Sequence, residues 1–116
     1  MGHGKHMILD LYGCPREILD DYDYLQEVME TAISMSGATL LRIFGEKFSP
    51  QGVTLLALLA ESHASIHTWP EQGYAAVDLY TCNPEGVTPH KAVEYIKEKL
   101  GATDVKEQEV ERQTTL

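Results

Sequence analysis

Hydrophobic and polar residues alternate in two segments of the chain, residues 6–12 and 74–82. Each segment has an apolar row at every second position: Met7, Leu9 and Leu11 in the first, and Ala75, Val77 and Leu79 in the second. Because successive side chains of a strand point to opposite faces of a sheet, both segments are predicted to be strands with one buried face. Their other faces carry polar groups and rings: His6, Asp10, Tyr12, Asp78, Tyr80 and Cys82. A further strand is expected over about 38–44.

Two other segments have apolar residues at the three- and four-residue spacing of an amphipathic helix. The first helix is expected between Asp20 and Gly37. The second is expected to have Thr88 as its N-cap, Pro89 as its first residue and Gly101 as its stop. The apolar stripes are Leu25, Val28, Met29, Ala32 and Ile33 in the first helix and Ala92, Val93, Ile96 and Leu100 in the second.

The run of residues 53–60 is apolar at nearly every position. Such a run is typical of an internal strand that is covered on both faces. Two helices cover only one face of a small sheet, so the second face needs cover from a second protomer or a ligand, and we expect a homodimer. The charged tail from Asp104 is expected to form at best an edge strand and then to fray. The predicted fold is therefore α+β: a two-layer sandwich, a mainly antiparallel sheet with two helices on one face.

Size and charge narrow the class of protein. At 116 residues the chain is expected to be a single domain, 1–116. Its net charge of −9 argues against nucleic acid and anionic membranes as partners. With no leader and no apolar run of membrane-spanning length, a cytoplasmic location is expected. Cys14 and Cys82 form no CxxC pattern, so neither a zinc site nor a dithiol redox site is predicted.

Groups able to carry chemistry are concentrated in residues 61–71, which read ESHASIHTWPE and directly follow the apolar run. A single strand through both segments would be unusually long, so we expect a turn near Glu61 and Ser62. The strand after that turn then has three polar residues on one face: His63, Ser65 and His67. If this strand pairs with the strand that ends at Cys82, His67 and Cys82 share one pocket with a serine at the bend.

Each of these residues also has a purely structural explanation. A serine or histidine at a strand end is structural in most proteins, and a lone cysteine such as Cys82 is more often a small buried hydrophobe than a catalyst. Trp69 beside Pro70 suits a plug of the core. His63 and His67 lack a clear third ligand, so a metal site is not predicted.

The eleven-residue segment as a whole is more specific than its parts. It resembles the self-cleavage and active-site motif of the small prokaryotic, pyruvoyl-dependent S-adenosylmethionine decarboxylases. The resemblance extends over nearly the whole chain, and the other matching segments are 4–6, 36–39 and 73–82. It implies a proenzyme that cleaves itself between Glu61 and Ser62 into a β chain, 1–61, and an α chain, 62–116. It also implies that Ser62 becomes a covalent pyruvoyl group that caps the α chain.

The resemblance further implies a role for each reactive residue. Ser62 Oγ attacks the preceding carbonyl to give an ester, and His67 is the proton acceptor that removes the serine α-proton during processing. The pyruvoyl group forms an imine with the substrate, S-adenosylmethionine, and takes up the electron pair left by CO2. Cys82 is then the proton donor to the product, which suits a thiol because thiols hold their proton at neutral pH. Thr54 stands where the family often has a serine that supports processing.

Substrate binding is implied in the same way. Phe48 and Trp69 match the aromatic residues around the adenine, and Glu71 matches the carboxylate on the ribose hydroxyls, with groups from both subunits of a homodimer. Aromatic rings suit a cationic sulfonium nucleoside. The product would be the aminopropyl donor for spermidine biosynthesis. The resemblance assigns no role to Lys5 or His63.

Two other functions also fit the sequence. An arginine decarboxylase of the same family shares the catalytic residues and differs in the shape of its pocket. A non-enzymatic, ferredoxin-like domain that binds a small effector would explain the fold, the dimer and the acidity, but it predicts a chain that stays intact. The mass of the purified protein therefore separates this last function from the decarboxylases.

Overall fold

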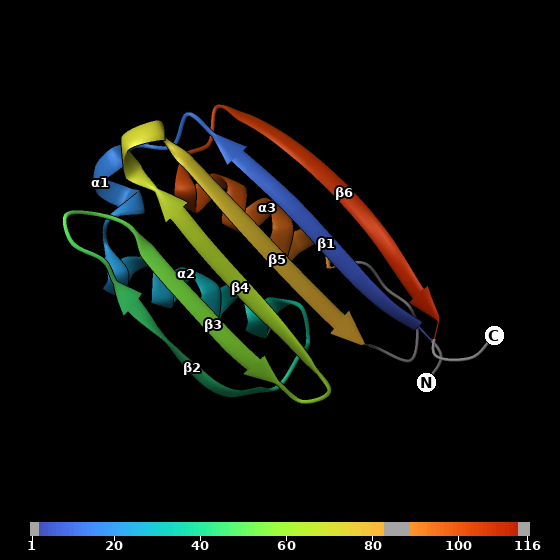
Figure 1. The fold of residues 1–116 in the computed structure, drawn as a ribbon. Helices are drawn as coiled ribbons and strands as arrows, with labels where there is room; N and C mark the ends of the chain where they lie inside the picture. Colours follow the sequence, from blue (N-terminus) through green and yellow to red (C-terminus); the bar gives the residue numbers. More distant parts are fainter. Residues whose placement is uncertain (1–2, 83–88, 114–116) are drawn as a thin grey trace.

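Six antiparallel strands form one sheet in the computed structural model, which describes residues 3–82 and 89–113 (Figure 1). The strands are β1 (His3–Tyr12), β2 (Leu40–Lys47), β3 (Val53–Leu59), β4 (Ser62–Trp69), β5 (Tyr74–Cys82) and β6 (Asp104–Gln113). Their order across the sheet is β2-β3-β4-β5-β1-β6, and each neighbouring pair is antiparallel. The apolar run therefore forms an internal strand, β3, as predicted.

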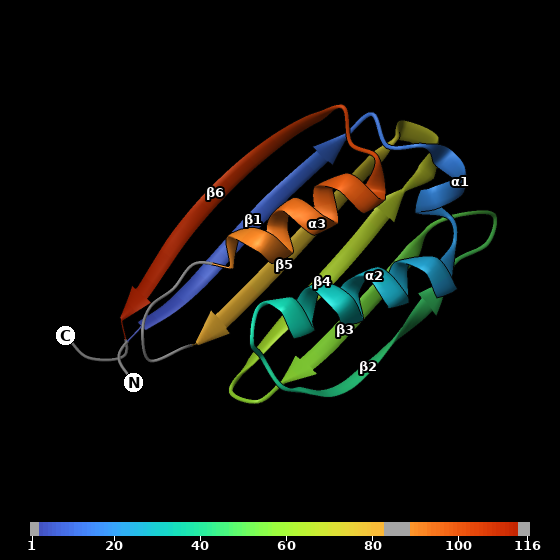
Figure 2. The same cartoon turned by 180° about the vertical axis from the view of Figure 1, so that it is seen from behind.

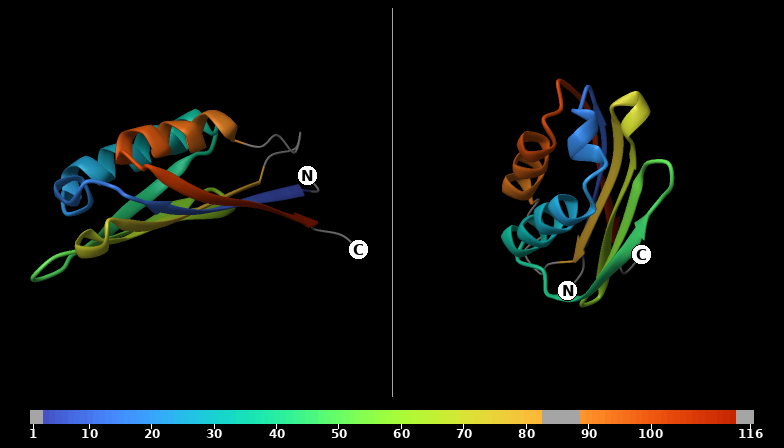
Figure 3. Two further views of the ribbon diagram at one scale, coloured as in Figure 1. Left: turned by 90° about the horizontal axis from the view of Figure 1, so that it is seen from above. Right: turned by 90° about the vertical axis from the view of Figure 1, so that its left-hand side faces the viewer.

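Two helices, α2 (Tyr22–Met35) and α3 (His90–Leu100), cover one face of this sheet (Figures 2 and 3). The Asp21 side chain accepts a hydrogen bond from the backbone N–H of Tyr24 at 3.1 Å and so caps the start of α2. Glycines in the left-handed conformation follow both helices, Gly37 at a φ of 82° and Gly101 at 66°. The two predicted stops and the predicted α+β sandwich are confirmed.

The core lies between the helices and the sheet. Every residue of the predicted helical stripes is buried there, with 2% or less of its surface exposed. The strands contribute alternate residues: Met7, Leu9, Leu11, Val53, Leu55, Ala57, Leu59, Ala64, Ile66, Ala75, Val77 and Leu79. Each fully buried Leu, Ile or Val stabilises the fold by about 1.5–3 kcal/mol relative to exposure. The faces of β1 and β5 are thus those predicted from alternation.

The charged C-terminal tail forms an edge strand, the most that the sequence analysis expected of it, and the fraying expected after that strand lies outside the described residues. This strand, β6, has ten residues and pairs with β1 along its whole length. Ion pairs fix this edge, because Lys5 Nζ lies 2.9 Å from Glu109 Oε2 and Lys97 Nζ lies 2.8 Å from Glu107 Oε1. Charged cross-strand pairs stabilise a sheet without any apolar alternation, and alternation was the signal that the prediction used.

Smaller differences lie at the helix starts. A four-residue helix, α1 (Arg16–Leu19), precedes α2 and is too short to show a hydrophobic period. Pro89 precedes the first residue of α3 instead of being it, and its carbonyl accepts the N–H of Val93 at 3.1 Å. The expected N-cap, Thr88, lies outside the described residues.

The second face of the sheet is covered by no helix of the described chain, and we refer to it as the open face (Figure 3). Leu56 and Leu58 of β3 are 41% and 49% exposed on it, and Phe44 of β2 is 54% exposed. A single protomer therefore covers β3 on one side only. The second apolar side needs cover from outside the chain, as the sequence argument requires.

Candidate active site

A two-residue turn, Ala60 and Glu61, joins β3 to β4, and Leu59 pairs with Ser62 across it (Figure 1). The turn predicted near Glu61 and Ser62 is therefore present. Glu61 has a φ of 66° and is the one non-glycine residue with a positive φ in the described ranges. L residues other than Asn and Asp rarely adopt this conformation. The bond expected to be cut thus follows a backbone outlier.

Ser62 begins β4 with its side chain on the helix side of the sheet, the side of Ala64 and Ile66. Its Oγ is buried and has no hydrogen-bond partner among the described residues, and the same holds for Thr81 Oγ1. Thr81 is the next residue of β5 after Tyr80, which pairs with His63, so the two hydroxyls lie on adjacent strands. A buried hydroxyl without a partner costs about 1–3 kcal/mol, so it calls for an explanation.

Thr54 and His67 face each other across β3 and β4 on the open face. Thr54 Oγ1 lies 3.0 Å from His67 Nδ1, within hydrogen-bond distance. This contact orients the imidazole through Nδ1, and its other nitrogen, Nε2, is the one that Thr54 does not hold. The hydroxyl proposed to support processing is therefore in contact with the histidine proposed to act as the base.

The three residues expected to bind substrate lie at the same end of the sheet as His67. Trp69 ends β4, is 39% exposed, and stacks on Tyr74 with ring centroids 5.2 Å apart. Trp69 therefore does not fill the core, which was the alternative explanation for this residue. Glu71 lies in the 3₁₀ turn η1 (Pro70–Gln72), which links β4 to β5. Phe48, 47% exposed, follows β2 in the loop that leads to β3.

Two further contacts rigidify this end. Asp20 Oδ1 accepts the N–H of Gly52 at 2.8 Å and pairs with Lys47 Nζ at 3.0 Å, which lowers the pKa of Asp20 and holds the loop that bears Phe48. The Tyr74 hydroxyl donates to Asp10 Oδ1 at 2.5 Å, and this bond raises the pKa of Tyr74 to about 12.

Cys82 ends β5 on the open face, at the opposite end of the sheet. Tyr80, two residues earlier, has a pKa raised chiefly by a hydrogen bond with Cys82. Its ring forms a cluster with those of His6 and His63, with centroid distances of 5.7 and 5.6 Å from Tyr80 and 6.5 Å between the two histidines. His6 Nε2 in turn lies 2.9 Å from Asp78 Oδ1. Sequence reasoning put Tyr80 and His6 on this face but gave them no role, since only the register of β1 on β5 shows that they meet.

The expectation that His67 and Cys82 share one pocket is wrong for a single protomer. His67 pairs with Ala76, and the six residues from Ala76 to Cys82 span about 20 Å at about 3.3 Å per residue. Ser62 is five residues from His67, about 16 Å along β4, and points to the other face. The η1 connection is short and pairs Trp69 with Tyr74. His67 is close to this turn and therefore pairs with a residue at the start of β5, whereas Cys82 is at the far end of β5.

The predicted site residues thus form two groups, one at each end of the sheet. The His67 end consists of Phe48, Thr54, His67, Trp69 and Glu71, and the Ser62 end consists of Glu61, Ser62 and Cys82. Between the two ends the open face holds a depression of about 440 Å³ lined by side chains that include Phe44, Leu56, Leu58 and His63. Neither end contains all the groups that the expected chemistry needs.

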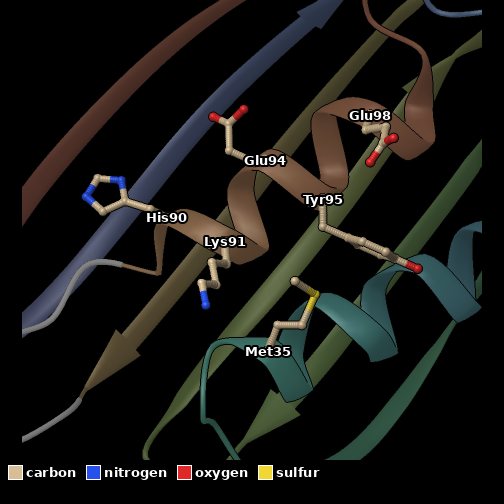
Figure 4. A pocket seen from close by; sticks show the side chains of 6 residues that line it. All are labelled: Met35, His90, Lys91, Glu94, Tyr95 and Glu98. Atoms are coloured by element: carbon tan, nitrogen blue, oxygen red, sulfur yellow. The ribbon is translucent and has the colours of Figure 1, made fainter.

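A second depression, of about 350 Å³, lies on the helix side between α2 and α3 (Figure 4). Met35 and Tyr95 line it together with charged residues of α3, and Glu94 already pairs with Lys97 at 2.8 Å. It contains none of the predicted site residues. Across residues 3–82 and 89–113, no group of three His, Cys, Asp or Glu side chains is arranged to hold a metal ion. In the same ranges, no helix has the length and apolar character needed to cross a membrane.

Comparison with known proteins gives one consistent family. Residues 5–113 match the family model described as S-adenosylmethionine decarboxylase. The chain is 54% identical over 99 residues to the S-adenosylmethionine decarboxylase proenzyme of Synechococcus sp. (strain WH7803), covering 85% of this chain and 77% of that relative. It is 50% identical over 111 residues to the proenzyme of Prochlorococcus marinus (strain MIT 9313), covering 96% and 88% of the two chains. The crystal structure of the adenosylmethionine decarboxylase from Aquifex aeolicus superimposes with a TM-score of 0.87 at 35% identity, covering 99% of this chain and 94% of that one.

Proposed function

Because the chain belongs to the S-adenosylmethionine decarboxylase family, we propose that it is a self-processing enzyme that decarboxylates S-adenosylmethionine. Cleavage between Glu61 and Ser62 gives residues 1–61 and 62–116, and Ser62 becomes the pyruvoyl group. The observation that carries this proposal is the buried Ser62 Oγ, which has no hydrogen-bond partner among the described residues and directly follows the Glu61 carbonyl.

The surroundings of Ser62 fit a pyruvoyl precursor. A serine that only stabilised the fold would use its buried hydroxyl in a hydrogen bond, whereas this oxygen has no bond to break before it attacks. Once formed, a pyruvoyl group supplies an electron sink for decarboxylation. The remaining steps fall to side chains that hold the substrate and move protons.

His67 accepts a proton during processing, and Thr54 keeps its imidazole oriented through Nδ1. Cys82 donates a proton to the product carbon at the end of turnover. Phe48 and Trp69 present exposed rings to the adenine and the sulfonium centre, and Glu71 binds the ribose hydroxyls.

A homodimer joined through the open faces brings these groups together. Within one protomer the His67 end lies about 16–20 Å from the Ser62 end. A two-fold axis that lies between two open faces, perpendicular to the strands, exchanges the ends and keeps the strand order. It sets the His67 end of one protomer against the Ser62 end of its partner, so each active site draws on both chains.

The same axis brings like surfaces together, because β3 lies over β3 of the partner and the patch formed by Leu56 and Leu58 meets the same patch of the second copy. Six strands about 4.8 Å apart and about eight residues long give each open face dimensions of about 24 by 26 Å. Two such faces bury at least about 1,200 Å² in total, which reaches the range of specific interfaces. The apolar half of the face thus suits burial against a second copy.

Mass analysis under denaturing conditions tests the function directly. After long incubation the wild type should give two fragments, residues 1–61 and 62–116, whereas Ser62→Ala should give full-length chain only. Processed protein should release CO2 from S-adenosylmethionine and not from arginine in parallel assays. A wild type that stays intact would refute self-processing, and release from arginine alone would assign the other substrate of the family.

A further inference from the structure

Apart from Glu61, all residues with a positive φ in the described ranges are glycines. These glycines are Gly13, Gly37, Gly52, Gly73 and Gly101, with φ between 63° and 109°. Glycine adopts such angles without the steric cost that a Cβ brings. At Glu61, with a φ of 66°, the side chain is retained. The one position that departs from the pattern is the residue before the proposed cleavage site.

The short hairpin keeps Glu61 in this conformation. Leu59 and Ser62 pair across the turn, so Ala60 and Glu61 alone must reverse the chain. Here the positive φ falls on the second central residue, as in a type II turn, where this place is usually taken by Gly or Asn. The N–H of Ala60 donates to the carbonyl of Thr39 at 2.9 Å, which ties the turn to the segment before β2. While the bond between Glu61 and Ser62 is intact, relaxation of Glu61 would therefore disturb the pair of Leu59 with Ser62 and the hydrogen bond of Ala60.

We propose that the left-handed conformation of Glu61 strains this turn and that self-cleavage releases the strain, an inference that rests on the proposed function. In the first step Ser62 Oγ bonds to the Glu61 carbonyl carbon, the bond from that carbon to the Ser62 nitrogen breaks, and the hydroxyl proton ends on the freed nitrogen. The link from the Glu61 carbonyl carbon to the Ser62 Cα then runs through Oγ and Cβ and is one bond longer. A longer link lets Glu61 leave the left-handed region, which favours the ester over the amide.

Two substitutions separate the strain from the carboxylate. Glu61→Ala removes the carboxylate and keeps the Cβ, and Glu61→Gly removes both, so the difference between the two variants reports the Cβ alone. We expect Glu61→Gly to cleave about tenfold more slowly than Glu61→Ala, a difference of about 1.4 kcal/mol in activation free energy. The amount of ester can be measured in a His67→Ala background, in which processing is expected to stop at the ester. Hydroxylamine cleaves esters selectively. It should therefore release less fragment from the Glu61→Gly protein than from the Glu61→Ala protein.

The strain itself is measured in Ser62→Ala protein, which cannot cleave. There Glu61→Gly should melt about 4 °C higher than Glu61→Ala at equal protein concentration. Gly37→Ala is the matched control, since it adds a Cβ at a φ of 82° where nothing else lies within 4 Å, and it should lower the melting temperature by a similar amount.

The outcomes are distinguishable from those that test the function. If the wild type never cleaves, both the proposed function and this inference are refuted. Wild type that cleaves, together with a Glu61→Gly variant that cleaves as fast as Glu61→Ala or melts no higher, overturns the inference alone.

Discussion

Ser62 and His67 of one chain are far apart, so the proposed shared active site can be tested by complementation: two variants that are inactive alone should restore cleavage in a mixed dimer. A general base must come within about 3 Å of the proton that it removes, directly or through one water. Five residues of β4 put His67 about 16 Å from Ser62 of its own chain, on the opposite face. The Oγ of Ser62 points to the helix side, so the proton within reach from the open face is the one on its Cα. We therefore expect His67 to remove the α-proton from Ser62 of the partner, so that Ser62→Ala and His67→Ala chains, each inactive alone, complement one another in a mixed dimer.

The expected yield follows from pairing statistics. When the two variants are unfolded, mixed in equal amounts and refolded together, random two-fold pairing puts about half of the His67→Ala chains with a Ser62→Ala partner. In these dimers the sheet end that bears the intact Ser62 lies against the sheet end that bears an intact His67, and the other site carries both lesions. Denaturing mass analysis should then find about half of the His67→Ala chains cleaved and every Ser62→Ala chain intact.

Wild type that is unfolded and refolded in the same way serves as the control for competence. If cleavage were to occur within one protomer, no chain in the mixture would be cleaved, since each chain lacks one required group. Complete absence of fragments, with the control fully processed, would refute both the shared site and the arrangement of the two open faces.

Three further results are expected. Leu58→Asp puts a charge at the centre of the apolar half of the open face, so it should convert the dimer to a monomer in sedimentation and abolish cleavage; a cleaved monomer would contradict this. Thr81→Val removes a buried hydroxyl without a described partner, so it should raise the free energy of unfolding of uncleavable Ser62→Ala protein by about 1 kcal/mol in urea, and a loss of that size would show that the hydroxyl is bonded. Because the pKa of Tyr74 is raised to about 12, its bond to Asp10 stabilises the fold below the ordinary tyrosine pKa of about 10, and this contribution is lost as the pH rises from 10 to 12. Asp10→Asn should shift the ultraviolet titration of this phenol to lower pH, and an unchanged titration would contradict the assignment.

The sequence predicted on which face of the sheet a side chain lies, but it did not predict which residue of the neighbouring strand lies beside it. Alternation alone assigned Leu9 and Val77 to the core and His67 and Cys82 to the other face, because side-chain direction depends only on the count of residues along a strand. Register depends on the length and shape of each connection. The η1 turn sets Trp69 opposite Tyr74, and this one fact moves Cys82 about 20 Å away from His67. The residues of the site could be named from the eleven-residue motif, but their division between two ends needed the sheet.

The division has a consequence for the order of events during maturation. A newly folded protomer holds Ser62 and Glu61 in a strained turn at one end and its own His67 at the other, beyond the reach of proton transfer. Under the proposed mechanism, ester formation needs only the local turn, whereas elimination needs the imidazole of a second chain. Strain and assembly therefore control different steps: the Glu61 conformation sets how much ester forms, and the dimer sets whether the ester goes on to the pyruvoyl group. An unassembled protomer would stop at the ester, because no imidazole reaches the α-proton of Ser62, so the pyruvoyl group would form only after the chain pairs.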